Sequence, residues 1–315
     1  MRLLVREPSR VQQALEPLGI GEVDYTVGDV TDAATVEQGM IGCDAAVHAA
    51  SVYSLDARTG KLMGRVNVEG TKVVLSAAAR LELDPVVYVS SLGVFYPPDG
   101  ATLDEQSPVK EPPGLYYGSK AGAEQIARGY QERGVPVVTS YPGGVFGPND
   151  PHFGESARLV AGILKRHLPV VPRGGLSVVD VRDLARAHAV MLEPNRGARR
   201  YVLSGTHLPF ASIIRTLEEE TGRLIPHVSL PGWSLSPAVR AAGFLQRFLP
   251  FRLPVDAEGL DSVVWDPHGN DSLARTDLGF AARPYRETLA DTVAWLYRAR
   301  RISASQAGSA VSGYR

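Results

Sequence analysis

The sequence has little cysteine, no long apolar run and almost no net charge. Cys43 is the single cysteine, which excludes an internal disulfide framework and a cysteine-based metal site, and no metal is expected. No stretch reaches the ~18 apolar residues of a membrane-spanning helix, and residues 1–10 are too short and too charged for a signal peptide. With a net charge of −1, the chain has no field that would attract nucleic acid or anionic lipid. These absences predict a cytoplasmic protein with a small-molecule substrate, no nucleic-acid partner and no membrane span.

The sequence does contain a regular alternation of short apolar strands with helical patterns over its first two-thirds. Strands are expected at residues 3–5, 22–27, 44–50, 86–90 and 135–140, and helices at 11–18, 33–40, 63–81 and 116–133. Such alternation implies right-handed crossovers and a parallel sheet covered on both faces. The predicted fold class is α/β, a doubly wound parallel sheet that binds ligands at the carboxyl ends of its strands.

Tyr116 and Lys120 stand four residues apart, a spacing that places both side chains on one face of a helix. A phenol with a reference pKa of about 10 is a weak base at neutral pH, and a nearby ammonium favours its phenolate form. The pair would allow Tyr116 to exchange a proton with an alcohol or a ketone. A surface tyrosine and lysine on a helix would show the same spacing. Tyr117 stands three residues from Lys120 and is not part of the predicted pair.

Ser90 and Ser91 stand at the end of the apolar strand expected at 86–90. This position puts their hydroxyls at the carboxyl edge of the sheet, where ligands bind. A serine hydroxyl there would orient a carbonyl group against the Tyr116 phenol. The alternative is that both serines only satisfy the amides of a turn. His48 and Asn67, which lie in the neighbouring strand and the following helix, are interpreted as structural residues.

These motifs resemble those of the extended short-chain dehydrogenases/reductases, in the broad NAD-dependent epimerase/dehydratase group. The matching segments keep the order of the family between about residues 3 and 192, at 28–32, 47–50, 67–71, 89–95, 116–120, 141–148 and 179–183. Among its members, the chain looks most similar to ketone reductases and hydroxysteroid dehydrogenases of the dihydroflavonol-reductase type. The resemblance implies a Rossmann-like fold and an NAD(P)-dependent enzyme that transfers a hydride to or from a carbonyl or secondary alcohol.

The resemblance also implies how the chain is divided. The dinucleotide-binding domain would span 1–150 plus 178–205, and a smaller C-terminal substrate lobe with a closing helix would span 151–177 and 206–300. Within the lobe, residues 231–258 mix Pro, Phe, Leu and Arg without clear periodicity, and the apolar residues of 233–253 would suit an apolar substrate. Residues 301–315 are rich in Ser, Gly and Ala and are expected to form a disordered tail.

By the same resemblance, Ser91, Tyr116 and Lys120 would form the catalytic set. Ser91 is preferred to Ser90 because it stands three residues before Val94, as in many relatives. The nicotinamide would supply the hydride, Tyr116 the proton and Ser91 the orientation of the carbonyl group.

The cofactor would be held along one edge of the sheet. Besides Tyr116 and Lys120, the implied contacts are Asp29 and Val30 at the adenine, Ala49 and Ala50 along the channel, and Pro142 and Val145 beside the nicotinamide carboxamide. Arg6 ends the first expected strand, where an acidic residue would suit the ribose of NAD and an arginine suits a 2′-phosphate. NADP is therefore expected rather than NAD, unless Arg6 is simply a solvated residue in a basic turn.

The family's opening strand and Gly-x-x-Gly-x-x-Gly turn have no counterpart in this sequence, whose first residues match the family's second strand. The absent unit would be about 30 residues long, and its strand would be central in the order 3-2-1-4-5-6. Without it, two interior strands lose their common neighbour and the pyrophosphate loses its backbone amides. We therefore expect an N-terminally truncated fold, either from an internal start at Met1 or in a truncated paralogue, and weak or no NADPH binding by the chain as given.

Two other functions stay open. A nucleotide-sugar epimerase would need basic groups for a diphosphate, for which Arg240, Arg247 and Arg252 are the candidates. Dehydratases of this group usually carry an acidic pair where Leu92 and Gly93 stand, which argues against dehydration. The missing loop supports an inactive binding protein as the third function. A homodimer also stays open.

Overall fold

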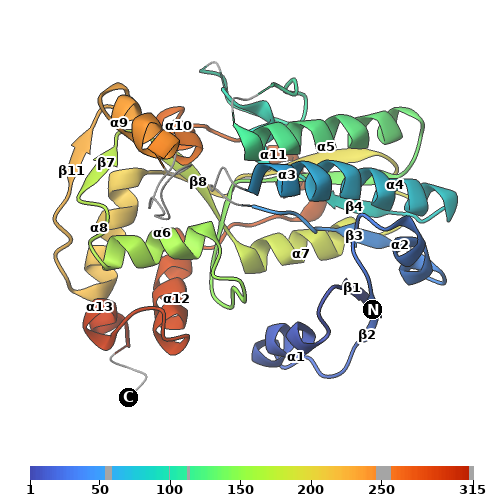
Figure 1. Ribbon diagram of the computed structural model, residues 1–315, viewed down its shortest axis with the longest axis horizontal. Coiled ribbons are helices and arrows are strands. Elements are labelled where there is room, and N and C mark those ends of the chain that lie inside the picture. Colours follow the sequence, from blue (N-terminus) through green and yellow to red (C-terminus); the bar gives the residue numbers. More distant parts are fainter. Residues whose placement is uncertain (54–58, 99, 112–113, 246–256, 312–315) are drawn as a thin grey trace.

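The computed structural model describes residues 1–53, 59–98, 100–111, 114–245 and 257–311. Its largest sheet is parallel and contains β3 (Ala46–His48), β4 (Val86–Val89), β5 (Val137–Pro142) and β9 (Arg199–Leu203), in that order. Helices alternate with these strands along the chain (Figure 1), which confirms the predicted α/β class. None of the helices in the described residues has the length and apolarity to cross a membrane.

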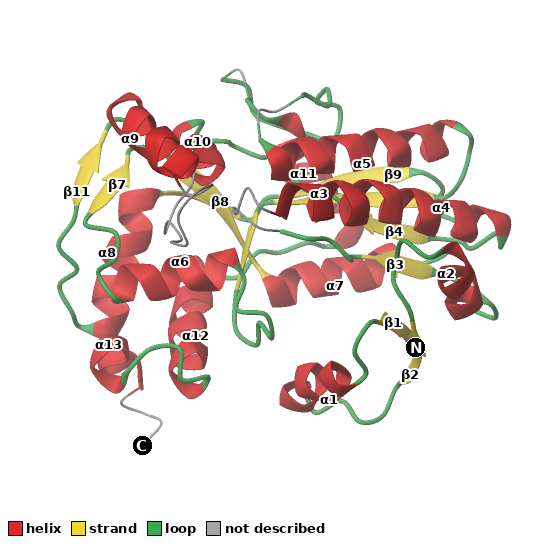
Figure 2. Ribbon diagram, in the orientation of Figure 1, coloured by secondary structure: helices red, strands yellow, loops and turns green. Residues whose placement is uncertain are grey.

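Side chains of this sheet alternate between two cores, as the two-residue period of a strand requires. Val86 and Tyr88 belong to one cluster with residues of α4 (Gly70–Arg80) and α5 (Leu115–Glu132). Val87 belongs to a second cluster with residues of α7 (Val181–Met191) and α11 (Ser272–Leu278). The sheet is therefore covered on both faces, as Figure 2 shows for α5 and α7.

The long helix expected at 63–81 is present with a change of geometry in its first half. It begins as α3 (Gly60–Met63), continues through a π-helical segment (Gly64–Glu69) and ends as α4. The strand expected at 44–50 is shorter than predicted, because β3 ends at His48. Ala49 and Ala50 consequently lie in the loop that follows β3.

The first two strands form a sheet of their own. β1 (Arg2–Val5) pairs in parallel with β2 (Asp24–Val27), and α1 (Ser9–Leu15) and a short 3-10 turn (Glu16–Leu18) connect them. Among the described strands, neither β1 nor β2 pairs with β3. α2 (Ala33–Met40), which Asp32 caps, packs against β1, β2 and α4 and is the main link between the two sheets. The separation is the one expected for strands that lack a common neighbour.

The C-terminal lobe is built on its own core. Around this core lie β6 (Gly144–Phe146), β8 (Gly175–Asp180) and β10 (Thr206–Pro209) in one sheet, and β7 (Val170–Pro172) with β11 (Val228–Leu230) in another. Of these strands, β6 and the last three residues of β8 fall within the range predicted for the dinucleotide-binding domain. The helices of the lobe are α6 (Glu155–Leu164), α8 (Phe210–Thr221), α9 (Gly232–Leu245), α10 (Ala257–Val264) and α12 (Tyr285–Arg298). Helices α6, α8 and α12 lie together (Figure 1), and side chains of all three share one buried cluster.

Two expectations about this lobe were wrong. The segment 231–258, which shows no periodicity, contains helix α9 with Pro237 inside it. Residues 301–311, expected to be disordered, include α13 (Ala304–Ala307) and a 3-10 turn (Gly308–Val311). A capping box between Ser303 and Gln306 starts α13, and Ala307 and Val311 are buried against the lobe. The cap and the burial of Ile302, Ala307 and Val311 against α8 and α12 thus account for the order of this segment.

Candidate functional site

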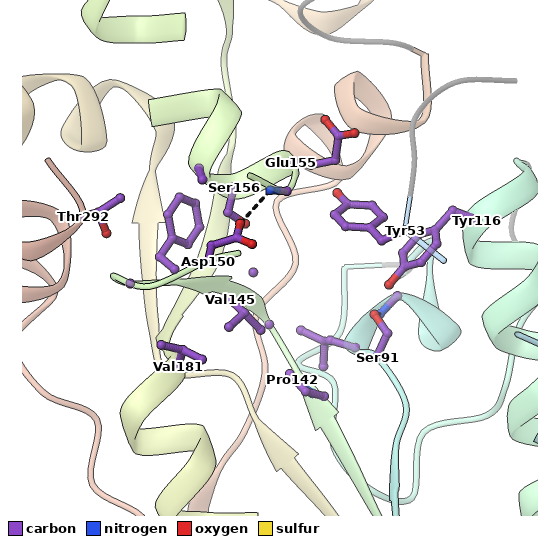
Figure 3. A pocket seen from close by; sticks show the side chains of 18 of the residues that line it. Tyr53, Ser91, Tyr116, Pro142, Val145, Asp150, Glu155, Ser156, Val181 and Thr292 are labelled. Atoms are coloured by element: carbon purple, nitrogen blue, oxygen red, sulfur yellow. Dashed lines mark hydrogen bonds between the residues drawn. The ribbon is translucent and has the colours of Figure 1, made fainter. Parts of the chain in front are cut away.

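The side chains predicted to act together meet where β4 and β5 end. Ser91 follows β4, Pro142 ends β5, and Tyr116 lies in the first turn of α5. All three line one cavity of about 430 Å³, together with Tyr53 and Val145, and we call it the tyrosine cavity. In Figure 3 the hydroxyl groups of Ser91 and Tyr116 point toward one another.

Ser91, rather than Ser90, presents its hydroxyl to this cavity. Ser91 caps the 3-10 turn Leu92–Phe95, and its Oγ accepts a hydrogen bond of 3.1 Å from the Gly93 amide. Ser90 is buried, does not line the cavity, and its Oγ has no hydrogen-bond partner among the described residues. A Cβ atom on Gly93 would stand 2.2 Å from the Tyr117 ring, so only glycine allows the turn after Ser91 to lie against α5.

Tyr116 and Tyr117 have different surroundings although they are adjacent. Tyr116 is half-buried, and its ring lies 4.3 Å from that of Tyr53, centroid to centroid. Burial raises the pKa of the Tyr116 phenol, and a hydrogen bond with Ser91 partly opposes that rise. Tyr117 is buried in a cluster with Tyr96. The two tyrosines therefore differ in exposure, although Tyr117 also lines the tyrosine cavity.

Lys120 lies one helical turn after Tyr116, and its side chain is held between α5 and β4. The residue is 5% exposed, and its Nζ donates a hydrogen bond of 3.3 Å to the Val89 carbonyl at the end of β4. Burial lowers the pKa of Lys120 to about 8, and the Glu124 carboxylate opposes this change. The ammonium form therefore still predominates at neutral pH.

A carboxylate from the C-terminal lobe holds the start of the helix that carries Tyr116. Glu258 of α10 accepts hydrogen bonds from the amides of Tyr116 (3.2 Å) and Tyr117 (2.6 Å) and is 8% exposed. Gly114 provides the space for this carboxylate, because a Cβ atom at Gly114 would stand 2.5 Å from the carboxyl carbon of Glu258. Anionic groups are favoured at a helix N-terminus, where the amide groups lack partners. Sequence reasoning missed Glu258 because no local signal connects residues 142 positions apart.

Asn67 and His48 serve as structural supports, as the sequence suggested. Asn67 lies in the π-helical segment, exchanges hydrogen bonds with the Val52 backbone (2.7 and 3.0 Å) and donates to Ser119 Oγ at 2.9 Å. His48 Nε2 bonds Thr71 Oγ1 at 3.0 Å, and burial lowers the pKa of His48 to about 3. Asn67 thus ties the loop after β3 to the helix that carries Tyr116.

Two further cavities adjoin the tyrosine cavity. The first, of about 370 Å³, is the apolar cavity, which shares Tyr53, Tyr96 and Tyr117 with the tyrosine cavity. Its other lining residues are mainly aliphatic or aromatic and include Leu159, Leu168, Val171, Leu176, Phe210, Leu235, Val239, Leu260 and Val263. Trp233, expected to face the substrate, is 78% exposed instead.

The second is the N-terminal cavity, of about 790 Å³, which shares Pro151 with the tyrosine cavity. The predicted residues Arg6, Asp29, Val30, Ala49 and Ala50 all line it. Asp29 Oδ1 accepts hydrogen bonds from the Thr31 amide (3.0 Å) and hydroxyl (2.7 Å). These bonds lower the pKa of Asp29, to which the nearby Arg6 also contributes.

Two of the three cavities contain residues predicted to hold a dinucleotide. The residues predicted for the adenine end line the N-terminal cavity, and those for the nicotinamide end line the tyrosine cavity. Lys120 lines neither cavity and lies beneath Tyr116 on α5. In the described part of the chain, no glycine-rich turn lies between the two ends. The two ends of a dinucleotide therefore fit, whereas its pyrophosphate finds no amide cradle.

Arg240, a candidate for binding a diphosphate, forms an ion pair of 2.9 Å with Asp261. Arg247 and Arg252 lie outside the described residues. The described part of the chain thus provides one of the three arginines, and its charge is already compensated.

Comparisons with known proteins agree with this architecture. Residues 3–204 match the model of the NAD dependent epimerase/dehydratase family. The chain is 31% identical over 304 residues to a proposed dihydroflavonol 4-reductase of Synechocystis sp., covering 94% of this chain and 87% of that protein. It is 26% identical over 299 residues to the sterol demethylase protein B of Methylococcus capsulatus, covering 94% and 90%. Among solved structures, a double mutant of the dTDP-glucose 4,6-dehydratase of Streptomyces venezuelae with NAD bound shares the fold, with a TM-score of 0.73, 22% identity and coverage of 95% and 88%.

Proposed function

The chain belongs to the NAD-dependent epimerase/dehydratase family and is an NAD(P)-dependent oxidoreductase, and on this premise we propose that it reduces the ketone of an apolar substrate with Ser91, Tyr116 and Lys120 as catalytic residues. The observation that carries the proposal is the meeting of the Ser91 and Tyr116 hydroxyls in a cavity that continues into an apolar one. Bound NAD(P) would supply the hydride.

The residues of this chain would handle the carbonyl oxygen and the proton. Ser91 donates a hydrogen bond to the oxygen and orients it toward Tyr116. Because burial raises the pKa of Tyr116, the phenol holds its proton at neutral pH and is suited to give it to the developing alkoxide. The Lys120 ammonium stabilises the phenolate left after that transfer. A phenol that keeps its proton is in the protonation state that reduction of a ketone requires.

The apolar cavity supports a substrate with little charge. Aliphatic and aromatic side chains line most of it, and ligand pockets of this composition bind by burying apolar surface. The two relatives compared above carry names that refer to a dihydroflavonol and a sterol. A nucleotide sugar would need free cationic groups for its diphosphate, whereas Arg240 is paired with Asp261. Dehydration is also disfavoured, because Gly93 lies too close to Tyr117 to accept an acidic side chain.

The preference for NADP over NAD rests on Arg6. This exposed arginine lies at the end of β1 and lines the N-terminal cavity, within reach of Asp29 electrostatically. A guanidinium there would pair with a 2′-phosphate. The division into a dinucleotide-binding domain and a substrate lobe, the cytoplasmic location and the homodimer stay predictions.

The decisive experiment compares Tyr116→Phe with Tyr117→Phe. Both variants remove one hydroxyl, from neighbouring residues on the same helix. In a protein extended by the family's opening strand and glycine-rich turn, with NADPH and a panel of apolar ketones, Tyr116→Phe should lower kcat by about 100- to 10,000-fold, the usual contribution of a general acid, and leave the Kd for NADPH nearly unchanged. Tyr117→Phe should retain most of the activity. Equal activity of wild type and Tyr116→Phe would remove Tyr116 from the mechanism, and turnover of nucleotide sugars alone would reject the apolar substrate.

A further inference from the structure

Outside the three cavities, two histidines and an aspartate converge on the surface of the C-terminal lobe. His207 lies on β10, and Asp266 and His268 lie in the segment between α10 and α11. The ligand atoms of these side chains all lie within 4.8 Å of one another. None of the three residues lines the tyrosine, apolar or N-terminal cavity.

The two imidazole rings face the same carboxylate. His207 Nε2 stands 2.9 Å from Asp266 Oδ1, and His268 Nε2 stands 3.9 Å from Oδ2. The rings are stacked, with centroids 3.7 Å apart and planes inclined by 24°. Each Nε2 atom therefore lies near one oxygen of the same aspartate.

The backbone around the cluster is held firmly. His207 is paired with Ser177 in the antiparallel β8–β10 ladder. Ser177 Oγ donates to the Pro267 carbonyl at 3.2 Å, and the Leu103 amide donates to the His268 carbonyl at 2.7 Å. The segment that carries Asp266 and His268 is thus fixed at successive residues, so little chain entropy remains to be lost when a ligand binds.

Gly175 provides space for this arrangement. A Cβ atom there would stand 2.7 Å from both Asp266 Oδ1 and His207 Cε1, and 2.6 Å from the Leu208 carbonyl. Any other residue at this position of β8 would push the His207–Asp266 pair apart. The pair therefore depends on a glycine of a neighbouring strand.

We propose that His207, Asp266 and His268 form a binding site for a divalent transition metal, with Zn²⁺ as the fitting ion. Zn²⁺ takes imidazole nitrogens and a carboxylate oxygen at about 2.0–2.2 Å, which places tetrahedral ligand atoms about 3.3 Å apart. The observed N–O separations of 2.9 and 3.9 Å lie on either side of that value, and the two stacked rings, whose centroids are 3.7 Å apart, would have to splay when the ion binds. Two imidazoles disfavour Mg²⁺ and Ca²⁺, which prefer oxygen ligands. The exposure of Asp266 and His268 leaves the fourth position to water.

Such a metal would join two parts of the substrate lobe. His207 belongs to the β6–β8–β10 sheet, whereas Asp266 closely follows α10, which carries Glu258 and the cavity residues Leu260 and Val263. A bound ion would fasten the end of α10 to that sheet. The site is structural and independent of the proposed hydride transfer.

The test uses the full chain without an affinity tag, freed of metal with a chelator and titrated with ZnCl₂ by calorimetry. One Zn²⁺ per chain is expected, with a melting temperature that rises with Zn²⁺ concentration. His207→Ala and His268→Ala should each weaken binding by about 100-fold or more, because changes beyond the ligands themselves already cost about 10–100-fold. Gly175→Ala should weaken it by about tenfold. His152→Ala, an exposed histidine elsewhere, is the matched control and should bind as wild type does.

Spectroscopy keeps the proposal testable if one variant fails to fold. His268 is 55% exposed at its side chain, so His268→Ala should fold even where His207→Ala does not. Co²⁺ in place of Zn²⁺ should give the visible absorption of a four-coordinate ion in wild type and lose it in His268→Ala. No Zn²⁺ binding by wild type, or binding that both histidine variants retain, would overturn the site.

Discussion

The β1–β2 sheet and the β3–β4–β5–β9 sheet are both parallel and both bear residues of the proposed active site, but they are packed very differently. In the larger sheet every residue of β5 is buried, and so are Val86, Val87 and Tyr88 of β4. In the smaller sheet no residue of β1 or β2 is fully buried, and α1 between them contains no buried residue. The residues proposed for the chemical step therefore lie at the well-packed larger sheet, whereas Arg6 and Asp29 lie at the less buried smaller sheet.

The two sheets differ in burial because their strands have different numbers of neighbouring strands and helices. β4 and β5 each have a hydrogen-bonded strand on both sides and helices on both faces, whereas β1 and β2 pair only with each other among the described strands. The N-terminal cavity lies along this small sheet, beside the loop after β3. Ser91 and Tyr116 are therefore placed by a rigid core, and the adenine-side residues are placed chiefly by α2 and its contacts.

The largest expected effect is on stability and comes from matched leucine truncations in the two regions. Leu75 of α4 is completely buried under the larger sheet, whereas Leu4 of β1 is only partly buried. Leu75→Ala should lower the free energy of unfolding by about 2–5 kcal/mol, and Leu4→Ala by less than half as much. Urea denaturation measures both. Equal losses would show that the two sheets are packed equally well.

The next effect concerns Glu258, which holds the start of α5. Glu258→Ala leaves the amides of Tyr116 and Tyr117 without a partner and should destabilise the protein by about 1–3 kcal/mol. These amides fix the first turn of α5, which positions the Tyr116 side chain. We therefore expect kcat to fall and the Kd for NADPH to change little. Glu258→Gln keeps an acceptor oxygen and should restore most of both properties. A drop in kcat that Glu258→Gln does not relieve would mean that the negative charge itself is needed.

The third effect is the acid sensitivity that His48 of the larger sheet contributes. His48 has its pKa lowered from 6.5 to about 3, so the unfolded chain binds a proton at this residue below pH 6.5 and the folded chain does not. Stability is therefore fully present above pH 6.5 and falls as the pH drops toward 3, by at most about 1.4 kcal/mol per pH unit from this residue.

Comparing wild type with His48→Gln measures this contribution as the slope of the unfolding free energy against pH. The variant should show a shallower slope between pH 6 and 4.5. Both proteins should have the same slope between pH 7 and 8, where His48 is neutral in either state. Identical slopes in the acid range would indicate that His48 charges without unfolding the sheet.

The smallest effect is expected in the small sheet, where Arg6→Asp should alter cofactor choice and leave stability unchanged. An exposed charge contributes about 1 kcal/mol or less, so the ratio of kcat/KM for NADPH over NADH should fall by about five- to tenfold. Steady-state kinetics with both cofactors checks it, and unfolding in urea should match wild type. A parent enzyme that already prefers NADH would refute the role of Arg6.

Local patterns predicted much of the candidate site. The spacing of Tyr116 and Lys120 and the serines that follow β4 each depend on residues within one element, and the structure places Tyr116 and Lys120 on α5 and Ser91 at the end of β4, while their catalytic roles stay predictions. The choice of Ser91 over Ser90 came from a family resemblance, and the structure agrees, because Ser91 lines the tyrosine cavity. The irregular segment 231–258 and the end of the chain were misjudged, because α9 and α13 form by covering other helices rather than through a periodic pattern.

By itself the sequence determined the elements, their order and the residues that each strand end and helix face would present, because these follow from periods of two and about 3.6 residues. Only the tertiary structure decided that Glu258 would hold the helix of Tyr116, that Gly93 would make room for Tyr117, and that His207 would meet Asp266 across 59 residues. The absence of the family's opening strand already predicted that two strands would lose their common neighbour. That β1 and β2 pair with each other and, among the described strands, with no other was decided by the tertiary structure, since a strand's neighbours are chosen by the whole chain.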